Sequence, residues 1–412
     1  MRLKFIVPPA LFFALACTGG SGSDSDSGET DTTATDSGAT DTDTEADADT
    51  DTDTDADADA DTDADTDADT DADPGEPLTE LSDPCGGGGT PYALTFLDTD
   101  NGYVGCGNGL GLWKTDDGGQ SFTRGHPSTD LYVYEVEQDD AGRLLLCGHD
   151  YDSTSDGGLL FRLDGSTWST LLSYGNNNSD PAAVYMSNCG AMAISGSDRL
   201  MVASLTAGDI TWSEDDGLTW VKEERYWEDA NLDSGGYSYY YMLSMTALSD
   251  GSIYGGGSQI TEPPIFFSPT LHSQGDWTNF HANTVDNSLI GEVQSMATHD
   301  DGMTWLVGGR DQDATTVASG FIYRSTDGGD SWTSIPLPEG VDVVHDIEMD
   351  GDRGIAVGHR YPTTQGGFIL LTEDAGLTWT EVKADPHILQ TAAIVGDTWW
   401  AAGDAWLGTG SF

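Results

Sequence analysis

Residues 341–382 alternate apolar and polar positions in short runs that are separated by turn residues. Val341-Asp-Val-Val-His-Asp-Ile-Glu-Met349 has the period of two that is typical of a half-buried strand. Asp350-Gly-Asp-Arg353 then predicts a tight turn. Gly354-Ile-Ala-Val-Gly358, Phe368-Ile-Leu-Leu-Thr372 and Trp379-Thr-Glu-Val382 predict three further strands. This stretch therefore predicts four antiparallel strands joined in sequence.

The same four-strand pattern recurs along the chain in six full repeats. They span residues 91–126, 131–174, 185–223, 239–281, 292–336 and 341–383. Three more strands are predicted around Gln390–Val395, Thr398–Ala402 and Trp406–Gly410, and Pro77-Leu-Thr-Glu-Leu81 can supply a fourth, which would join the two ends of the domain. We therefore expect an all-β fold, a single seven-bladed β-propeller of four-stranded antiparallel blades over residues 75–412. Six or eight blades are the alternatives.

Four segments between predicted third and fourth strands share the pattern Ser/Thr-x-Asp-x-Gly-x-Ser/Thr-aromatic. They are Thr115–Phe122, Ser213–Trp220, Ser325–Trp332 and Thr372–Trp379. With two weaker copies that end at Trp168 and Trp277, the aromatic residues lie 46 to 57 residues apart, a period typical of propeller blades. The pattern resembles the Asp-box, or bacterial neuraminidase repeat. We expect its carboxylates to accept hydrogen bonds from turn amides and to be structural, not catalytic; they are Asp117, Asp215, Asp327 and Asp374.

The N-terminal part has the composition of an export signal followed by a spacer. Residues 1–16 combine a basic start with an apolar run that is too short to span a membrane, which predicts a signal peptide. Cys17 stands where the lipid-modified cysteine of a bacterial lipoprotein would be, although ordinary cleavage after Ala14-Leu-Ala16 is the alternative. Residues 17–74 form an Asp/Thr/Ala-rich spacer with 22 carboxylates, expected to be disordered and extended. Loose Ca²⁺ binding is its alternative role; no other cofactor is expected.

The predicted propeller is itself strongly acidic. The whole chain has 72 Asp and Glu against 14 Lys and Arg, a net charge of −58. Removing the spacer's 22 carboxylates and the two basic residues of the signal leaves 50 acidic residues against 12 basic ones. Such a charge argues against nucleic acid and anionic lipid as partners, so we expect contact with a membrane only through the N-terminal lipid. A cationic partner, divalent ions or a saline habitat all fit it.

Four cysteines remain in the predicted domain. An exported chain permits disulfides, and four cysteines allow three pairings. Cys106 and Cys147 align in the second strands of neighbouring blades, too far apart to bridge, which favours Cys85–Cys106 and Cys147–Cys189. No CxxC or HxxH spacing indicates a metal site.

Long loops of the middle repeats mark the expected binding face. They include the segment that joins the third and fourth repeats, with Arg225, Tyr226 and Trp227. Arg310 and Arg360 align in Val307-Gly-Gly-Arg310 and Val357-Gly-His-Arg360, so they are expected side by side as a fork for a carboxylate or sulfate. The alternative is that each pairs with a nearby acidic residue, for which Asp311, Asp313 and Asp404 are the candidates.

The rhythm of residues 102–119, Gly-Tyr-Val-Gly followed by Leu-Trp-Lys-Thr-Asp-Asp-Gly-Gly, resembles photosystem II assembly factor-like propellers. That resemblance implies a non-enzymatic binding or assembly scaffold for a protein or polysaccharide partner. With the signal and Cys17, we expect a monomeric lipoprotein at the cell surface or in the periplasm. Sialidases share the Asp-box, so a sialidase-type glycoside hydrolase is the alternative. That family's Phe-Arg-Ile-Pro motif is matched only in part by Phe161-Arg-Leu-Asp164. No catalytic residue is assigned.

Overall fold

The computed structural model describes the predicted propeller and none of the N-terminal signal and spacer. Described are residues 78–86, 89–150, 158–173, 188–196, 198–203, 210–223, 241–258, 265–268, 278–279, 291–311, 320–361, 366–385 and 387–412. All of them fall in one compact unit that includes Pro74–Phe412. Cys17, Arg225, Tyr226 and Trp227 lie outside these ranges. The described residues form strands and turns and contain no helix that could cross a membrane.

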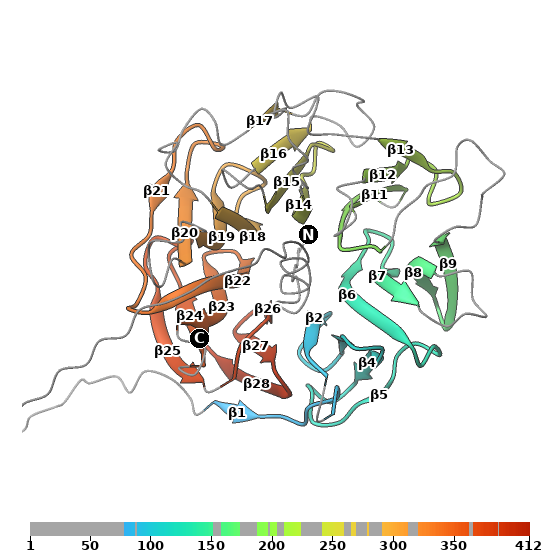
Figure 1. Ribbon diagram of the computed structural model, residues 1–412, viewed down its shortest axis with the longest axis horizontal. Helices are drawn as coiled ribbons and strands as arrows, with labels where there is room; N and C mark the ends of the chain where they lie inside the picture. Colours follow the sequence, from blue (N-terminus) through green and yellow to red (C-terminus); the bar gives the residue numbers. More distant parts are fainter. Residues whose placement is uncertain are drawn as a thin grey trace, which may run out of the picture. The chain divides into compact units, whose positions relative to one another are not determined.

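The strands follow one another in antiparallel groups of four, each starting with an inner strand (Figure 1). The first three groups are β2 Pro91–Phe96, β3 Gly102–Cys106, β4 Gly111–Thr115 and β5 Thr123–Arg124; β6 Leu131–Gln138, β7 Leu144–Asp150, β8 Gly158–Asp164 and β9 Thr167–Ser173; and β10 Ala191–Ser195, β11 Arg199–Ala203, β12 Ile210–Ser213 and β13 Val221–Glu223. The next three are β14 Tyr241–Ala247, β15 Ile253–Ser258, β16 Ile265–Ser268 and β17 Thr278–Asn279; β18 Gly291–Thr298, β19 Trp305–Asp311, β20 Gly320–Ser325 and β21 Thr333–Ser334; and β22 Val341–Asp350, β23 Arg353–Arg360, β24 Gly367–Thr372 and β25 Thr380–Asp385.

The last group joins the two ends of the domain, as the sequence predicts. It consists of β26 Thr391–Val395, β27 Thr398–Gly403, β28 Trp406–Ser411 and the N-terminal β1 Thr79–Glu80. Strand β1 pairs with β28 through Thr79 opposite Thr409 and Glu80 opposite Gly408. The pairing covers the edge of β28, which would otherwise be free to pair with another chain.

The number of hydrogen-bonded sheets corrects the expected blade count. Five sheets have four strands, but β14–β17 and β18–β21 are joined into one sheet of eight, so the described strands make six sheets instead of seven. The joint is a single pair, Ser258 of β15 opposite Glu292 of β18. The sequence pattern predicts the four-strand repeat. It does not predict that strands of two neighbouring repeats are hydrogen-bonded to each other.

Apolar clusters hold each group of four strands against the next. One cluster joins β2–β4 to β6–β8, and equivalent clusters follow around the unit until Leu94 and Val104 pack with Trp400 and Leu407 of the last group. In this last cluster the rings of Phe96 and Trp400 stack at 3.8 Å between centroids. The core therefore lies between successive sheets, and each sheet contributes both of its faces to it.

Candidate functional site

The inner strands share one irregularity, a β-bulge. It redirects one side chain in each group of four strands. The register of β6 skips Tyr134, that of β14 skips Leu243 and that of β22 skips His345. In the last group, Gln390 donates its backbone N–H to the Ala402 carbonyl although Thr391 is the residue opposite Ala402. The same position in the remaining groups holds Tyr92, Gly190 and Gln294.

Glycines on the second strands make the bulges sterically feasible. A Cβ at Gly309 would lie 1.8 Å from the carbonyl oxygen of Glu292, and one at Gly358 would lie 2.0 Å from that of Val343. The bulge pushes these carbonyls against the second strand, so only glycine fits opposite them. This explains the glycines of the Val307-Gly-Gly-Arg310 and Val357-Gly-His-Arg360 segments.

The bulges bring together side chains from strands that are not neighbours in a sheet. The Tyr92 and Tyr134 rings are stacked with centroids 6.3 Å apart, and Tyr134 also packs against Leu243 of β14. All three are buried, and burial raises the pKa of Tyr92 to about 12. The bulge positions of the first, second and fourth groups therefore form an aromatic and apolar lining.

The corresponding positions of the fifth, sixth and seventh groups are polar, and that of the third group is Gly190. His345 is 4% exposed, its Nε2 lies 2.9 Å from Nδ1 of His359, and His359 lies beside the carboxylate of Asp342. Burial, with further contributions from His359 and Arg310, lowers the pKa of His345 well below its usual value, so it is neutral at pH 7. Gln390 is 1% exposed, and neither its side-chain oxygen nor its nitrogen has a hydrogen-bond partner among the described residues.

Next to the bulges lies a set of four carboxylates, which we call the axial carboxylates: Glu135, Glu137, Asp346 and Glu348. They come from β6 and β22, and each is at most 4% exposed. Glu135 accepts the backbone N–H of Met192 at 2.7 Å, and Asp346 accepts that of Ala392 at 2.9 Å. Each bond satisfies an N–H on the inner edge of the next group, which its own sheet leaves unpaired.

The axial carboxylates influence one another. Burial is the largest cause that raises the pKa of Glu135 well above its usual range, and Glu137, Asp346 and Glu348 raise it further. The Met192 N–H is the opposing contribution. The Oε1 atom of Glu135 has no hydrogen-bond partner among the described residues. A positive charge placed here would relieve this repulsion.

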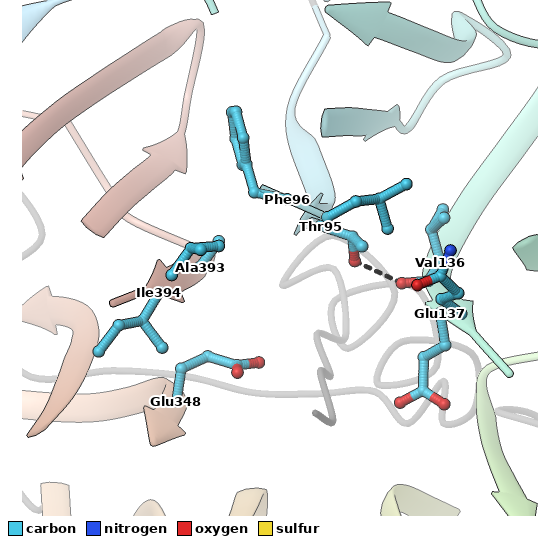
Figure 2. Close-up of a pocket in the computed structure, with 10 residues that line it drawn as sticks. Thr95, Phe96, Val136, Glu137, Glu348, Ala393 and Ile394 are labelled. Carbon is cyan, nitrogen blue, oxygen red and sulfur yellow. Dashed lines mark hydrogen bonds between the residues drawn. The ribbon is translucent and has the colours of Figure 1, made fainter. Parts of the chain in front are cut away.

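A pocket opens where the inner strands end. It has a volume of about 240 Å³ and is lined by Thr95, Phe96, Leu97, Val136, Glu137, Gln138, Glu348, Ala393, Ile394 and Val395. Figure 2 shows Glu137 and Glu348 on two sides of it, while the Thr95 hydroxyl donates to the Val136 carbonyl and ties β2 to β6. Since these residues end the inner strands, the pocket is on the face of the short turns, opposite the long loops where the sequence places the site.

The arginines proposed as an anion fork have intramolecular partners. Arg310 Nε lies 3.8 Å from Asp342, and its side chain is about half exposed. Arg360 binds Glu381 at 2.5 Å through Nη2 and the Glu339 carbonyl through Nη1. Arg310 therefore pairs with Asp342 and Arg360 with Glu381. Asp313, one of the aspartates named as candidates, lies outside the described residues. Their role as a joint anion site stays a prediction.

The four repeated turns share one hydrogen-bond arrangement. In the turn after β24, Asp374 accepts the Thr378 N–H at 2.8 Å through Oδ1 and the Thr378 hydroxyl at 2.6 Å through Oδ2, while the Thr372 hydroxyl also donates to Oδ1. Asp117, Asp215 and Asp327 repeat these contacts. Bonds from the side chain and backbone of the following Ser or Thr lower the pKa values of these three. All four carboxylates are thus occupied within their own turns.

A fifth full copy of the pattern lies at a different place in its repeat, so the spacing of the other four does not predict it. Thr298-His-Asp-Asp-Gly-Met-Thr-Trp305 connects β18 to β19 instead of a third to a fourth strand. Thr298 accepts the Gly302 N–H at 2.7 Å, and Asp300 accepts both the N–H and the hydroxyl of Thr304. A search for the pattern without regard to its spacing would have found it.

The two disulfides join the pairs favoured by the sequence, Cys85–Cys106 and Cys147–Cys189. Within the described residues no group of three or more His, Cys, Asp or Glu side chains is arranged to hold a metal ion.

Comparison with known proteins gives the fold but no family. No protein-family model matches the chain, and no curated protein sequence matches it. Among solved structures, YCF48 from Cyanidioschyzon merolae superimposes with a TM-score of 0.56 at 13% identity, over 82% of this chain and 98% of that one. YCF48 bound to a D1 peptide gives 0.54 at 16% identity, over 82% and 96%. A GH74 xyloglucanase from Xanthomonas campestris gives 0.56 at 18% identity, over 81% of this chain and 53% of the enzyme. What this chain shares with all three is the β-propeller fold.

Proposed function

We propose that the chain is an exported lipoprotein, anchored through Cys17, whose propeller binds a segment of a partner polypeptide without catalysing a reaction. One observation carries the proposal. Around one axis, the inner strands bring together buried side chains that retain unused hydrogen-bonding capacity, among them Gln390 and Glu135, beside the Tyr92–Tyr134 pair. Aromatic surface next to a few placed polar groups is typical of a ligand site.

Three further observations support it. YCF48, a propeller of similar fold, has been solved with a bound D1 peptide, so such a scaffold can hold a polypeptide segment. The two disulfides are compatible with an oxidising compartment outside the cytosol. The sialidase-type alternative needs several arginines to hold a substrate carboxylate, whereas Arg310 and Arg360 bind acidic partners within the chain.

Selection from a random peptide library tests the proposal. The purified full-length chain, immobilised, is expected to enrich related peptides, and Gln390→Leu is expected to weaken their binding because it removes a polar group from the axis. Fluorogenic sialosides and xyloglucan are incubated with the same chain at acidic and neutral pH. Turnover of either substrate, or a selection that enriches no peptide, would overturn the proposal.

A further inference from the structure

The axis of the propeller combines negative charge with aromatic surface in a buried setting. The four axial carboxylates come from two strands, β6 and β22, that belong to different sheets. Glu137 of β6 and Glu348 of β22 line the same pocket, so the two strands present carboxylates to one region. Buried carboxylates that repel one another are costly, and a cation between them offsets the cost.

A second observation, independent of the carboxylates, indicates that this region receives a ligand. The amide of Gln390, buried at the bulge position of the last group, has no hydrogen-bond partner among the described residues for either of its polar atoms. Gln390 is two residues from Ala392, whose N–H binds Asp346. A buried amide without partners costs free energy unless something that enters the site completes its bonds.

The aromatic pair narrows the chemistry of that ligand. Tyr92 and Tyr134 lie at bulge positions on β2 and β6, and Tyr134 directly precedes Glu135. The faces of tyrosine rings attract organic cations. The N–H groups of such cations can also donate hydrogen bonds to carboxylates and to an amide oxygen. The described residues offer no set of ligands arranged for a metal ion. The combination thus favours an ammonium or guanidinium group over a bare metal cation.

From these observations we propose that the axis of the propeller binds a lysine or arginine side chain of the partner polypeptide, which enters through the pocket between Glu137 and Glu348. The inference rests on the proposed binding function and specifies the group that is recognised. The pocket volume of about 240 Å³ is enough for one long side chain but not for a folded element. Glu137 and Glu348 border this entrance, and Glu135 and Asp346 lie further in, where each binds the next inner strand.

Calorimetric titration of the full-length chain with three short peptides tests the inference. The probes are acetyl-Gly-Lys-Gly-amide, its arginine counterpart and its norleucine counterpart, which has a similar length but no charge. Charged hydrogen bonds at a buried site predict that the lysine or the arginine peptide binds roughly 10- to 100-fold more tightly than the norleucine peptide. Equal affinity for all three, or no heat from either cationic peptide at millimolar concentration, would overturn the inference.

Two double variants separate binding at the axis from non-specific attraction of cations to the acidic chain. Glu137→Gln/Glu348→Gln removes two charges at the pocket and is expected to reduce binding of the cationic peptide to the norleucine level. Asp116→Asn/Asp330→Asn removes two charges from exposed turn positions and is expected to leave it unchanged. Equal losses of affinity for the cationic peptide in the two double variants would mean that binding depends on overall charge, and would overturn the inference. If the library selects peptides whose affinity does not depend on lysine or arginine, the binding function stands and the inference fails.

Discussion

Removing the disulfide between Cys147 and Cys189 tests how strongly the second and third groups of strands depend on a covalent link. The bond joins β7 to the residue that lies two positions before β10, across a sequence separation of 42. In the chain-entropy account, cross-linking a loop of this size stabilises the folded state by about 4 kcal/mol at 25 °C. Cys147→Ala/Cys189→Ala removes that constraint without placing a hydroxyl among the apolar side chains that surround both sulfurs.

The expected shift in melting temperature follows from the size of the unit. Pro74–Phe412 holds about 340 residues, and unfolding entropy of about 2.1 cal/mol/K per residue gives roughly 0.7 kcal/mol/K. The double variant should therefore melt about 6 °C lower in differential scanning calorimetry. Cys85→Ala/Cys106→Ala, with a separation of 21, is the matched control; it should lose about 3 kcal/mol, or about 5 °C. A shift below ~2 °C for the longer loop would refute the reasoning.

Three further variants probe the axis, the turns and the bulges. The raised pKa of Glu135 means that its contribution to stability is present at low pH and is lost as pH rises. Glu135→Gln, which cannot ionise, should therefore melt at a higher temperature than the wild type at pH 8 but not at pH 4. The lowered pKa of Asp327 has the opposite sign: its stabilisation is lost as pH falls, so Asp327→Asn should be less stable than the wild type at pH 7, and the difference should disappear near pH 2. Gly309→Ala places a Cβ 1.8 Å from a backbone oxygen and should lower the melting temperature more than Gly125→Ala, whose nearest contact is a side-chain atom at 3.1 Å; equal shifts would contradict the steric account of the bulge.

Much of the fold is predictable from local patterns because each repeat is built from short-range signals. The period-two alternation of residues 341–349 corresponds to β22, and the predicted tail strands correspond to β26–β28, which β1 completes. The pairing between Ser258 and Glu292 is not predictable in this way. It depends on how two neighbouring repeats approach each other, which no single repeat encodes.

The candidate site was harder to predict because it depends on bulges. In the alternating pattern of 131–138, Glu135 and Glu137 are simply the polar positions of a half-buried strand. A bulge at Tyr134 shifts the register by one residue, so that these carboxylates become buried beside the next inner strand. The arginines of the long-loop face are the more conspicuous signal in the sequence, whereas the only local signal of the bulges is the glycines of the second strands.

The most direct test of the central claim is to locate a bound peptide by photo-crosslinking. A peptide selected by the full-length chain would carry a benzoylphenylalanine next to its lysine or arginine, and the crosslinked residues would be identified by mass spectrometry. The account predicts crosslinks to the inner strands β2, β6 and β22, close to Tyr134 and Glu348. Crosslinks confined to the outer strands or to the acidic spacer would contradict it.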